Sequence, residues 1–403
     1  MTGALLGPAS HANRRVESGN GLRNEQRKAR KWKASEKGGS MTKRRLVMAA
    51  VATLACLSWF AAPTSAQVGI ASADGKQTLN LGFLAQPQYE ALDNADATHT
   101  GENLFFRRLR IIMGGKINDK LSFFFETDTP NLGKGTAAGT KNPSTITIQD
   151  FLLTYSFANE FKVDAGMLLI PVSHNSQQSA ASLLYVDYGA FSFQHSAPLD
   201  SVVGRDYGLQ ARGYLANNHV EYRVAVLQGN RGTTSTLPFR TTARVVFNLF
   251  EADTGFFYMG TSLGKKHILS VGATYDEQKD YKAFSGDVFF DQPVGGGNAL
   301  TLQGDYTEYD GGTTFTKLPK QKAMLVEGGF YFAGIKLSPI AQYSKLTYDV
   351  ETTTYENQEK VGGGLAYWIN GHRNNIKVVA NQIKQDKAKN RMQYVVQWQV
   401  FTY

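Results

Sequence analysis

The chain has 403 residues and a formal net charge of +9, but this charge is concentrated in its first 66 residues. Those residues hold 12 of the 43 Lys and Arg residues and only 3 of the 34 Asp and Glu residues, which leaves 31 of each sign in residues 67–403. The basic balance of the whole chain is therefore no argument for binding nucleic acid, and we expect no such partner. The only cysteine, Cys56, lies in the same leader, which excludes a disulfide framework and a cysteine metal site from residues 67–403.

The leader itself reads as two parts. Residues 1–40 are polar and basic without periodicity, whereas 41–66 has a basic start, a mostly apolar middle and small residues before Gln67. This layout predicts a secretory signal peptide over 41–66. Because a signal peptide normally follows the initiating methionine, we expect Met41 to be the true start and residues 1–40 to be an upstream mis-annotation. The alternative is a genuine disordered basic leader.

Residues 103–129 predict a hairpin with one apolar face and one charged face. Apolar residues occupy every second position of both strands, and a short Asn-Asp-Lys turn joins the strands. The intervening positions carry basic residues on the first strand and acidic residues on the second, namely Arg108, Arg110, Glu126 and Asp128. A soluble sandwich would bury the apolar face in a core, whereas a membrane barrel would turn it to lipid and the charges to a wet lumen.

The rest of residues 67–403 favours the barrel. Strands of about ten residues follow one another, which is the length that a tilted barrel strand needs to cross a membrane. No apolar run after Gln67 is long enough for a transmembrane helix. The predicted strands are 77–89, 103–117, 121–129, 145–157, 161–170, 205–215, 219–228, 239–249, 267–276, 281–291, 299–309, 323–333, 335–346, 358–369, 375–385 and 390–403.

The connections between these strands alternate in length, as they do in outer-membrane barrels, where short turns lie on one side and long loops on the other. Two places fit this alternation poorly: 277–280 is short for a loop, and 251–266 is long for a turn. We therefore predict an all-β fold, a transmembrane antiparallel β-barrel of 16 strands. If Phe256–Thr261 forms a further strand, the number is 18.

Three stretches of the sequence resemble the phosphate-selective porin O and P family: FFRRLRIIMGGKINDKLSFFFETD, QDFLLTYSFANEFKVDAGMLLIPVS and GRDYGLQARGYLANNHVEYRVAVLQGN. The order of an Arg-rich strand, an acidic strand, a strand ending near Gly and Pro, a long loop and Gly-Arg-Asp carries the resemblance, which covers Asn103–Asn230. It implies a 16-stranded trimeric porin with inward-facing arginines that guide anions. The chain departs from the family in being electroneutral over 67–403.

In such a barrel, basic residues between outward-facing apolar neighbours must face the lumen, because an Arg or Lys at the bilayer midplane costs about 2–4 kcal/mol. These are Arg108, Arg110, Lys162, Arg212, Arg223 and Arg244. Two roles remain open for them. They form a ladder that attracts anions, or each is paired with a cross-strand carboxylate, Glu126 and Asp128 among them, and only braces the wall.

The long segment 171–204 is the third loop of such a porin, and we expect it to fold into the lumen as a constriction. A position at the rim or at the trimer interface is the alternative. Its candidate constriction residues are His174, Tyr185, Asp187 and His195. His174-Asn175-Ser176 has the residue types of an outer-membrane phospholipase, but three adjacent residues do not easily converge as a triad. We therefore expect no catalytic residues, no cofactor and no metal.

The sequence thus predicts a passive porin in the outer membrane of a Gram-negative cell, reached by export through the periplasm. Its expected partners are outer-membrane lipid, lipopolysaccharide and small, anionic solutes, and its expected assembly is a homotrimer. The alternatives are a non-conducting barrel that acts as an adhesin or structural anchor and, less in keeping with the residues, an outer-membrane hydrolase. Conductance in a bilayer separates the porin from the anchor.

Overall fold

The computed structural model describes residues 68–143, 145–196, 199 and 202–403, which belong to one compact unit. The predicted leader 1–40 and signal peptide 41–66 lie outside the described residues. Within the described part of the chain, no helix is long and apolar enough to cross a membrane.

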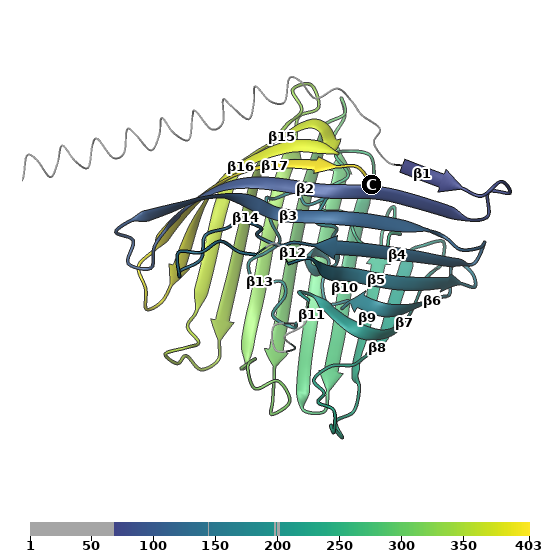
Figure 1. Cartoon of the computed structure of the whole chain (residues 1–403), viewed down its shortest axis with the longest axis horizontal. Coiled ribbons are helices and arrows are strands. Elements are labelled where there is room, and N and C mark those ends of the chain that lie inside the picture. Colours follow the sequence, from purple (N-terminus) through teal and green to yellow (C-terminus); the bar gives the residue numbers. More distant parts are fainter. Residues whose placement is uncertain (1–67, 144, 197–198, 200–201) are drawn as a thin grey trace, which may run out of the picture. The chain divides into compact units, whose positions relative to one another are not determined.

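Sixteen antiparallel strands of the described residues form a closed barrel (Figure 1). Each strand pairs with the next along the chain, and β17 pairs with β2 to close the ring. The strands are β2 (Thr78–Asp93), β3 (Thr100–Lys116), β4 (Leu121–Asp128), β5 (Thr147–Ser156), β6 (Lys162–Leu169), β7 (Arg205–Leu215), β8 (Val220–Leu227), β9 (Arg240–Asn248), β10 (Ile268–Gln278), β11 (Tyr281–Pro293), β12 (Ala299–Asp310), β13 (Gln321–Tyr331), β14 (Leu337–Tyr348), β15 (Gln358–His372), β16 (Asn374–Gln385) and β17 (Arg391–Phe401). The predicted all-β, 16-stranded barrel is confirmed.

Two short elements lie outside this ring. β1 (Val68–Ala71) pairs with the first residues of β2, and η1 (Asn175–Gln177) is a single 3₁₀ turn in the third loop. The alternative count of 18 strands is wrong. Asn248 of β9 pairs directly with Ser270 of β10, so the ring has no gap that Phe256–Thr261 could fill.

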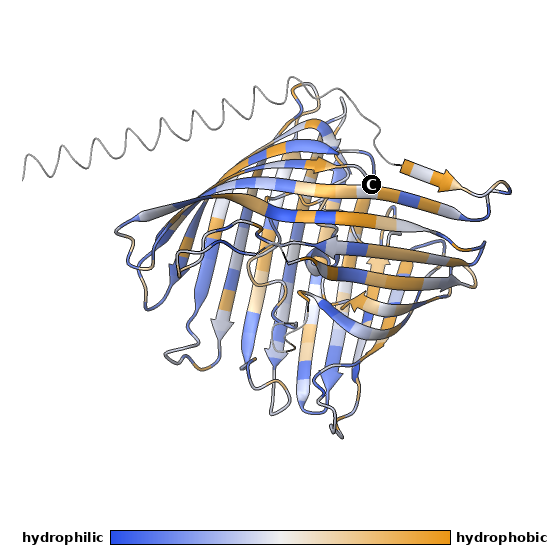
Figure 2. Ribbon diagram, viewed as in Figure 1, coloured by the Kyte–Doolittle hydropathy of each residue, from blue (hydrophilic) through white to orange (hydrophobic). Residues whose placement is uncertain are grey.

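Hydrophilic and hydrophobic residues alternate along many of the strands (Figure 2), as the period-two pattern predicts. In β12 the inward positions hold Thr301, Gln303, Asp305 and Thr307, all buried, while Leu302 and Tyr306 are 46% and 44% exposed. An apolar outer face and a polar inner face are the reverse of the arrangement in a soluble barrel. This arrangement suits a wall between lipid and a polar lumen.

A β-bulge in β3 changes the alternation at one place. Ala85 pairs with Leu109 and Pro87 pairs with Phe106, so Gln86 alone faces both Arg107 and Arg108. Pro87 has no N–H to give to a regular ladder, which is why prolines inside sheets accompany such irregularities. Both arginine side chains consequently contact groups inside the barrel. Simple alternation from the sequence placed only Arg108 there.

Short and long connections segregate as predicted. We call the side with most of the short connections the turn side and the opposite side the loop side. The turn side has 117–120, 157–161, 216–219, 294–298, 332–336 and residue 373, and the loop side has 94–99, 129–146, 170–204, 228–239, 311–320, 349–357 and 386–390. The two predicted misfits remain: 249–267 is a long turn-side connection, and 279–280 is a short loop-side connection.

The largest hydrophobic cluster lies where the third loop meets the inner wall of the barrel. It joins Leu184, Tyr185 and Val186 of the loop to Ile340, Ala366, Trp368, Val379 and Val395 of strands β14–β17. Burial of this apolar surface holds the loop against one wall.

Candidate pore constriction

The third loop, residues 170–204, lies inside the barrel. Its backbone is hydrogen-bonded to inward-facing side chains of the wall. Gln399 of β17 donates to the Ala181 carbonyl (2.7 Å), and Gln342 of β14 donates to the Asp187 carbonyl (3.1 Å). The loop therefore occupies the lumen instead of lying at the rim.

The two ends of the loop are held together, which directs the chain between them inward. The Ile170 N–H donates to the Gly204 carbonyl at 2.9 Å. Gly204 has a φ of +76°, and a Cβ there would lie 2.7 Å from the Phe193 ring. Both observations require glycine at this position. Asp200 of the same loop lies outside the described residues.

Lys377 of β16 anchors the middle of the loop. Its ammonium group donates to the carbonyls of Leu183 (2.6 Å) and Tyr185 (2.8 Å), and the whole side chain is buried. The Tyr185 hydroxyl donates to Asn381 on the same strand (2.8 Å). Burying an ammonium group without hydrogen-bond partners would cost free energy. The loop carbonyls supply these partners, so the bonds hold the loop against β16.

Asp187 ties the loop to β3, which lies three strands along the ring from β16. Its carboxylate accepts from Arg107 (2.7 Å) and Arg108 (2.6 Å), the two arginines of the bulge in β3. Burial would raise the pKa of Asp187, but the two guanidinium groups outweigh this effect and lower it. Asp187 therefore stays ionised and keeps both pairs.

The neighbouring arginines on this wall are also paired. Arg110 donates to Glu126 (2.5 Å) and Asp128 (2.9 Å), both on β4. Arg205, at the start of β7, donates to both carboxylate oxygens of Asp150 (3.1 and 2.9 Å). The guanidinium groups keep their charge because arginine does not deprotonate in proteins, and the pairing fixes where that charge lies.

The second segment inside the barrel is the long turn-side connection, residues 249–267. The Tyr258 N–H donates to the Gln177 carbonyl, and the Ser179 N–H donates to the Tyr258 carbonyl, both at 2.9 Å. Gln178 and Tyr258 thereby form an isolated parallel bridge between the two segments. The turn-side segment thus pairs through its backbone with the third loop and does not add a strand to the barrel sheet.

His174 joins the same two segments through its ring. The imidazole lies between the rings of Tyr258 and Phe289, with centroids 4.8 and 4.0 Å away and nearly parallel planes. Its Nε2 lies 3.1 Å from the Met259 carbonyl oxygen. Burial lowers the pKa of His174 to about 4, so the ring is neutral in this packing at neutral pH.

Four of the predicted basic residues form one row across adjacent strands. In the barrel register Lys162 is opposite Arg212, Arg212 is opposite Arg223, and Arg223 is opposite Arg244. Their side chains are engaged: Arg212 with Asp164 (2.6 Å), Arg223 with Glu221 (2.6 Å), Arg244 with Asp287 (2.6 Å) and Lys162 with Asn159 (3.4 Å).

The turn-side segment covers this row. Arg223 donates to the Phe256 carbonyl (2.9 Å) and the Gly255 carbonyl (3.2 Å), and its guanidinium carbon lies 4.7 Å from the centroid of the Tyr258 ring. Arg223 has no exposed surface, and Arg244 is 3% exposed. The predicted track of Arg212, Arg223 and Arg244 exists as a geometric row, but a packed segment lies over it.

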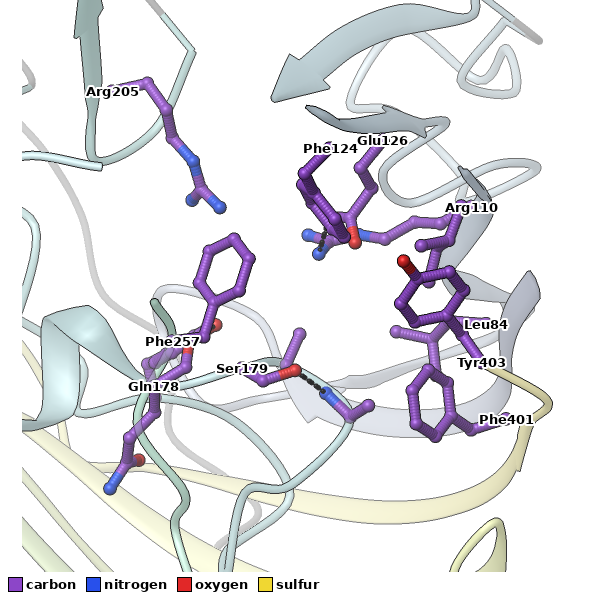
Figure 3. Close-up of a pocket in the computed structure, with 14 residues that line it drawn as sticks. Leu84, Arg110, Phe124, Glu126, Gln178, Ser179, Arg205, Phe257, Phe401 and Tyr403 are labelled. Carbon is purple, nitrogen blue, oxygen red and sulfur yellow. Dashed lines mark hydrogen bonds and ion pairs between the residues drawn. The ribbon is translucent and has the colours of Figure 1, made fainter. Parts of the chain in front are cut away.

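Open space also lies along the wall of β2–β7. A cavity of about 560 Å³ lies toward the loop side, and one of about 100 Å³ lies toward the turn side. Both are lined by Arg110, Tyr188 and Arg205, which marks these three residues as the junction between them. We call them the outer cavity and the inner cavity (Figure 3 shows the inner one).

The remaining predicted residues lie apart from these cavities. His195 is buried, and its carbonyl accepts from Arg240 (3.2 Å). The Ser176 hydroxyl donates to the Ser173 carbonyl (3.0 Å), so it is not directed at His174. No group of three or more His, Cys, Asp or Glu residues in the described chain is arranged to hold a metal ion.

Sequence reasoning missed Arg107, Arg205 and Lys360, which all line the outer cavity. The signal for Arg107 is Pro87 on the neighbouring strand, because a proline there predicts a bulge. Arg205 stands in the Gly-Arg-Asp motif that carried the family resemblance, but it begins a strand and so has no flanking alternation. Lys360 lies in a glycine-rich strand whose alternation is weak.

These observations define the class of the protein. A closed barrel with an apolar outer face and a polar lumen that an inserted loop narrows is the architecture of an outer-membrane channel of the porin class. Residues 79–255 match the family model described as phosphate-selective porin O and P. These residues belong to that family, as the sequence motifs indicated.

No curated protein matches the sequence, but solved outer-membrane proteins share the fold. Salmonella typhi OmpF, solved in complex with daunomycin, is 14% identical with a TM-score of 0.56, covering 82% of this chain and 100% of its own. The outer membrane channel DcaP of Acinetobacter baumannii is 13% identical with a TM-score of 0.53, covering 82% and 99%. The in-vitro folded trimer form of Vibrio cholerae OmpT is 11% identical with a TM-score of 0.51, covering 81% and 99%.

Proposed function

We propose that this chain is a passive porin that forms a water-filled channel for small solutes and prefers anions. The solute path runs along the wall of β2–β7, through the outer cavity and past Arg110, Tyr188 and Arg205 into the inner cavity. The third loop and the turn-side segment 249–267 occupy part of the remaining lumen. No catalysis or cofactor is needed for this function.

The charge of the outer cavity carries the proposal. Its lining holds Arg107, Arg108, Arg110, Arg205 and Lys360 against Asp128 and Asp187, and the buried partners Glu126 and Asp150 bring the acidic residues to four. Five basic and four acidic residues give the cluster a formal charge of +1.

Lys360 supplies the excess. It lies on β15 and lines the outer cavity together with Arg107 and Asp187. Among the residues that the structure describes, its ammonium group has no hydrogen bond or ion pair, whereas each arginine of the cluster has a carboxylate partner. An anion that enters the outer cavity meets this ammonium group and the partly exposed Arg107 first.

A single excess charge is sufficient for a preference at this place. Residues 67–403 have equal numbers of basic and acidic residues, so they create no overall field. A narrow lumen with walls of low dielectric constant focuses the field of the few charges that are not neutralised. The arginines then have both roles that the sequence left open. Their ion pairs hold the constriction in shape, and Lys360 makes its net charge positive.

The cellular setting follows from the same proposal. The barrel would reside in the outer membrane of a Gram-negative cell after export through the periplasm and removal of residues 41–66, in contact with lipid and lipopolysaccharide. We propose a homotrimer, because OmpT of Vibrio cholerae, which shares the fold, is described in a trimer form.

The test is the reversal potential of refolded 67–403 in a planar bilayer under a KCl gradient. Lys360→Glu changes the formal charge of the cluster from +1 to −1 and should convert an anion preference into a cation preference. Lys76→Glu makes the same charge change in the exposed turn between β1 and β2 and serves as the control. A wild type that conducts without selectivity, or a Lys360→Glu variant with unchanged selectivity, would refute the anion preference. An intact barrel that never conducts would favour the structural anchor.

A further inference from the structure

We propose that the inner cavity binds the apolar part of small carboxylates that carry a short branched alkyl group. The carboxylate would be held at Arg110 and Arg205 while the alkyl group enters the inner cavity. This inference rests on the proposed channel function and specifies which anions the channel retains.

The lining of the inner cavity departs from the chemistry of the rest of the lumen. Inward positions of the barrel are predominantly polar, but those on the turn side of Arg110 are apolar. The larger apolar side chains that line the inner cavity are Leu84, Ile112, Phe124, Phe257, Phe401 and Tyr403. Contact between such an apolar patch and the water of a porin lumen is unfavourable. The patch is therefore a candidate contact for an apolar group of the solute.

The barrel strands, the turn-side segment and the C-terminal residue together build this patch. Phe124 of β4 packs edge-to-face against Phe257 of the turn-side segment (5.4 Å between centroids) and against Tyr403 (6.0 Å). The Tyr403 ring fits because its neighbours are glycines: a Cβ on Gly114 would lie 2.1 Å from the Tyr403 hydroxyl oxygen. Figure 3 shows Phe124 and Tyr403 on one side of the cavity and Phe257 on the other.

The charged end of the cavity has an unused donor. Arg110 is 6% exposed, and its two terminal nitrogens donate to Glu126 and Asp128, but its buried Nε has no partner in the described structure. Arg110 lines both cavities, and a small shift of its side chain would present this N–H to an entering carboxylate. Glu126 also lines the inner cavity and pairs with Arg110, and Arg205 pairs with Asp150, so both guanidinium groups are held in fixed positions beside the cavity.

The size of the cavity limits the alkyl group. Its volume of about 100 Å³ is smaller than the roughly 150 Å³ of an apolar cavity that holds benzene. A branched group of three or four carbon atoms, as in isovalerate, matches this space. Acetate and inorganic phosphate can use the arginines but have no apolar part for the patch.

The experiment compares how isovalerate and acetate block the chloride current of refolded 67–403 in a planar bilayer. Full burial of each added methylene group would contribute about 0.8 kcal/mol, but the cavity is open to the junction and buries the group only in part. We therefore expect isovalerate to block at about tenfold lower concentration than acetate.

Two variants remove the patch without touching the arginines. Phe257→Ser changes a residue of the turn-side segment, outside the barrel strands. Ile112→Thr introduces threonine into β3, and threonine also occupies other inward positions of the barrel. Both should reduce the isovalerate advantage to about twofold or less while anion selectivity persists. Phe250→Ser is the matched control, because Phe250 is in the same turn-side segment but is 45% exposed and does not line the cavity.

The outcomes separate this inference from the proposed function. A wild type that selects anions but is blocked equally by isovalerate and acetate overturns the inference and leaves the anion channel intact. An isovalerate advantage that survives in both Phe257→Ser and Ile112→Thr overturns the assignment to the inner cavity. A barrel that does not conduct overturns both. Heat-dependent mobility on a gel identifies any variant that fails to fold, and the other variant then decides.

Discussion

Replacement of Lys377 by methionine should release the third loop from β16. Methionine has a similar length but no donor, so the carbonyls of Leu183 and Tyr185 lose the bonds that they now receive at 2.6 and 2.8 Å. A hydrogen bond from a charged group contributes roughly 1.5–3 kcal/mol net of hydration. The two together therefore hold the loop by roughly 3–6 kcal/mol, while the hydrogen-bonded ring of sixteen strands is unaffected.

Two readouts follow the released loop. Single-channel recordings should show a larger and noisier conductance, because the loop no longer keeps one position in the lumen. Chymotrypsin should cleave after Tyr185 or Tyr188 in Lys377→Met but not in the wild type, where these rings are packed inside the barrel. Lys384→Met is the control, since Lys384 is on the same strand as Lys377 but pairs with Glu359 of β15 instead of with the loop. A Lys377→Met channel with wild-type conductance and wild-type resistance to chymotrypsin would refute this anchoring.

Three further predictions test other parts of the account. Deletion of residues 255–258 from the turn-side segment should uncover Arg223 and raise the conductance; an unchanged conductance would mean that the segment does not obstruct the lumen. Burial lowers the pKa of His174 to about 4 from its ordinary 6.5, so its packing stabilises the loop fully above pH 6.5 and progressively less as the pH falls toward 4. Current noise should therefore rise on acidification in the wild type and less so in His174→Gln; noise that is independent of pH would contradict this. Residues 67–403 should refold in detergent and show a heat-dependent mobility shift without residues 1–66, and a helical far-UV spectrum would rule out the fold.

The fold was predictable because alternate residues of a barrel strand face lipid and lumen and differ in polarity accordingly. Lipid and lumen differ so strongly that period two survives along nearly every strand, and each predicted strand has a counterpart in the ring. The bulge in β3 is the instructive exception. One residue of β2, Gln86, faces two residues of β3, and from there toward the loop side the inward parity shifts, so that Phe105 is buried and Phe106 is exposed.

The candidate site was predictable only in part, because its partners are distant in sequence. Alternation gave the inward direction of Arg110 and the carboxylates of β4, which indeed pair with it. It did not give Asp187 as the partner of Arg108, because that contact depends on the path of the third loop through the lumen. Residues 251–266 are too long for a turn, but their aromatic run predicts a strand, and no local pattern in the sequence predicts the packing of Tyr258 on His174.

The most direct test of the central claim is the sign of the reversal potential of wild-type 67–403 across a bilayer with a KCl gradient, recorded together with its single-channel conductance. We predict discrete conducting steps and a reversal potential displaced toward the chloride equilibrium potential, because the excess charge of the outer cavity is positive. Absence of steps from a correctly folded barrel, or a displacement toward the potassium equilibrium potential, would contradict the account.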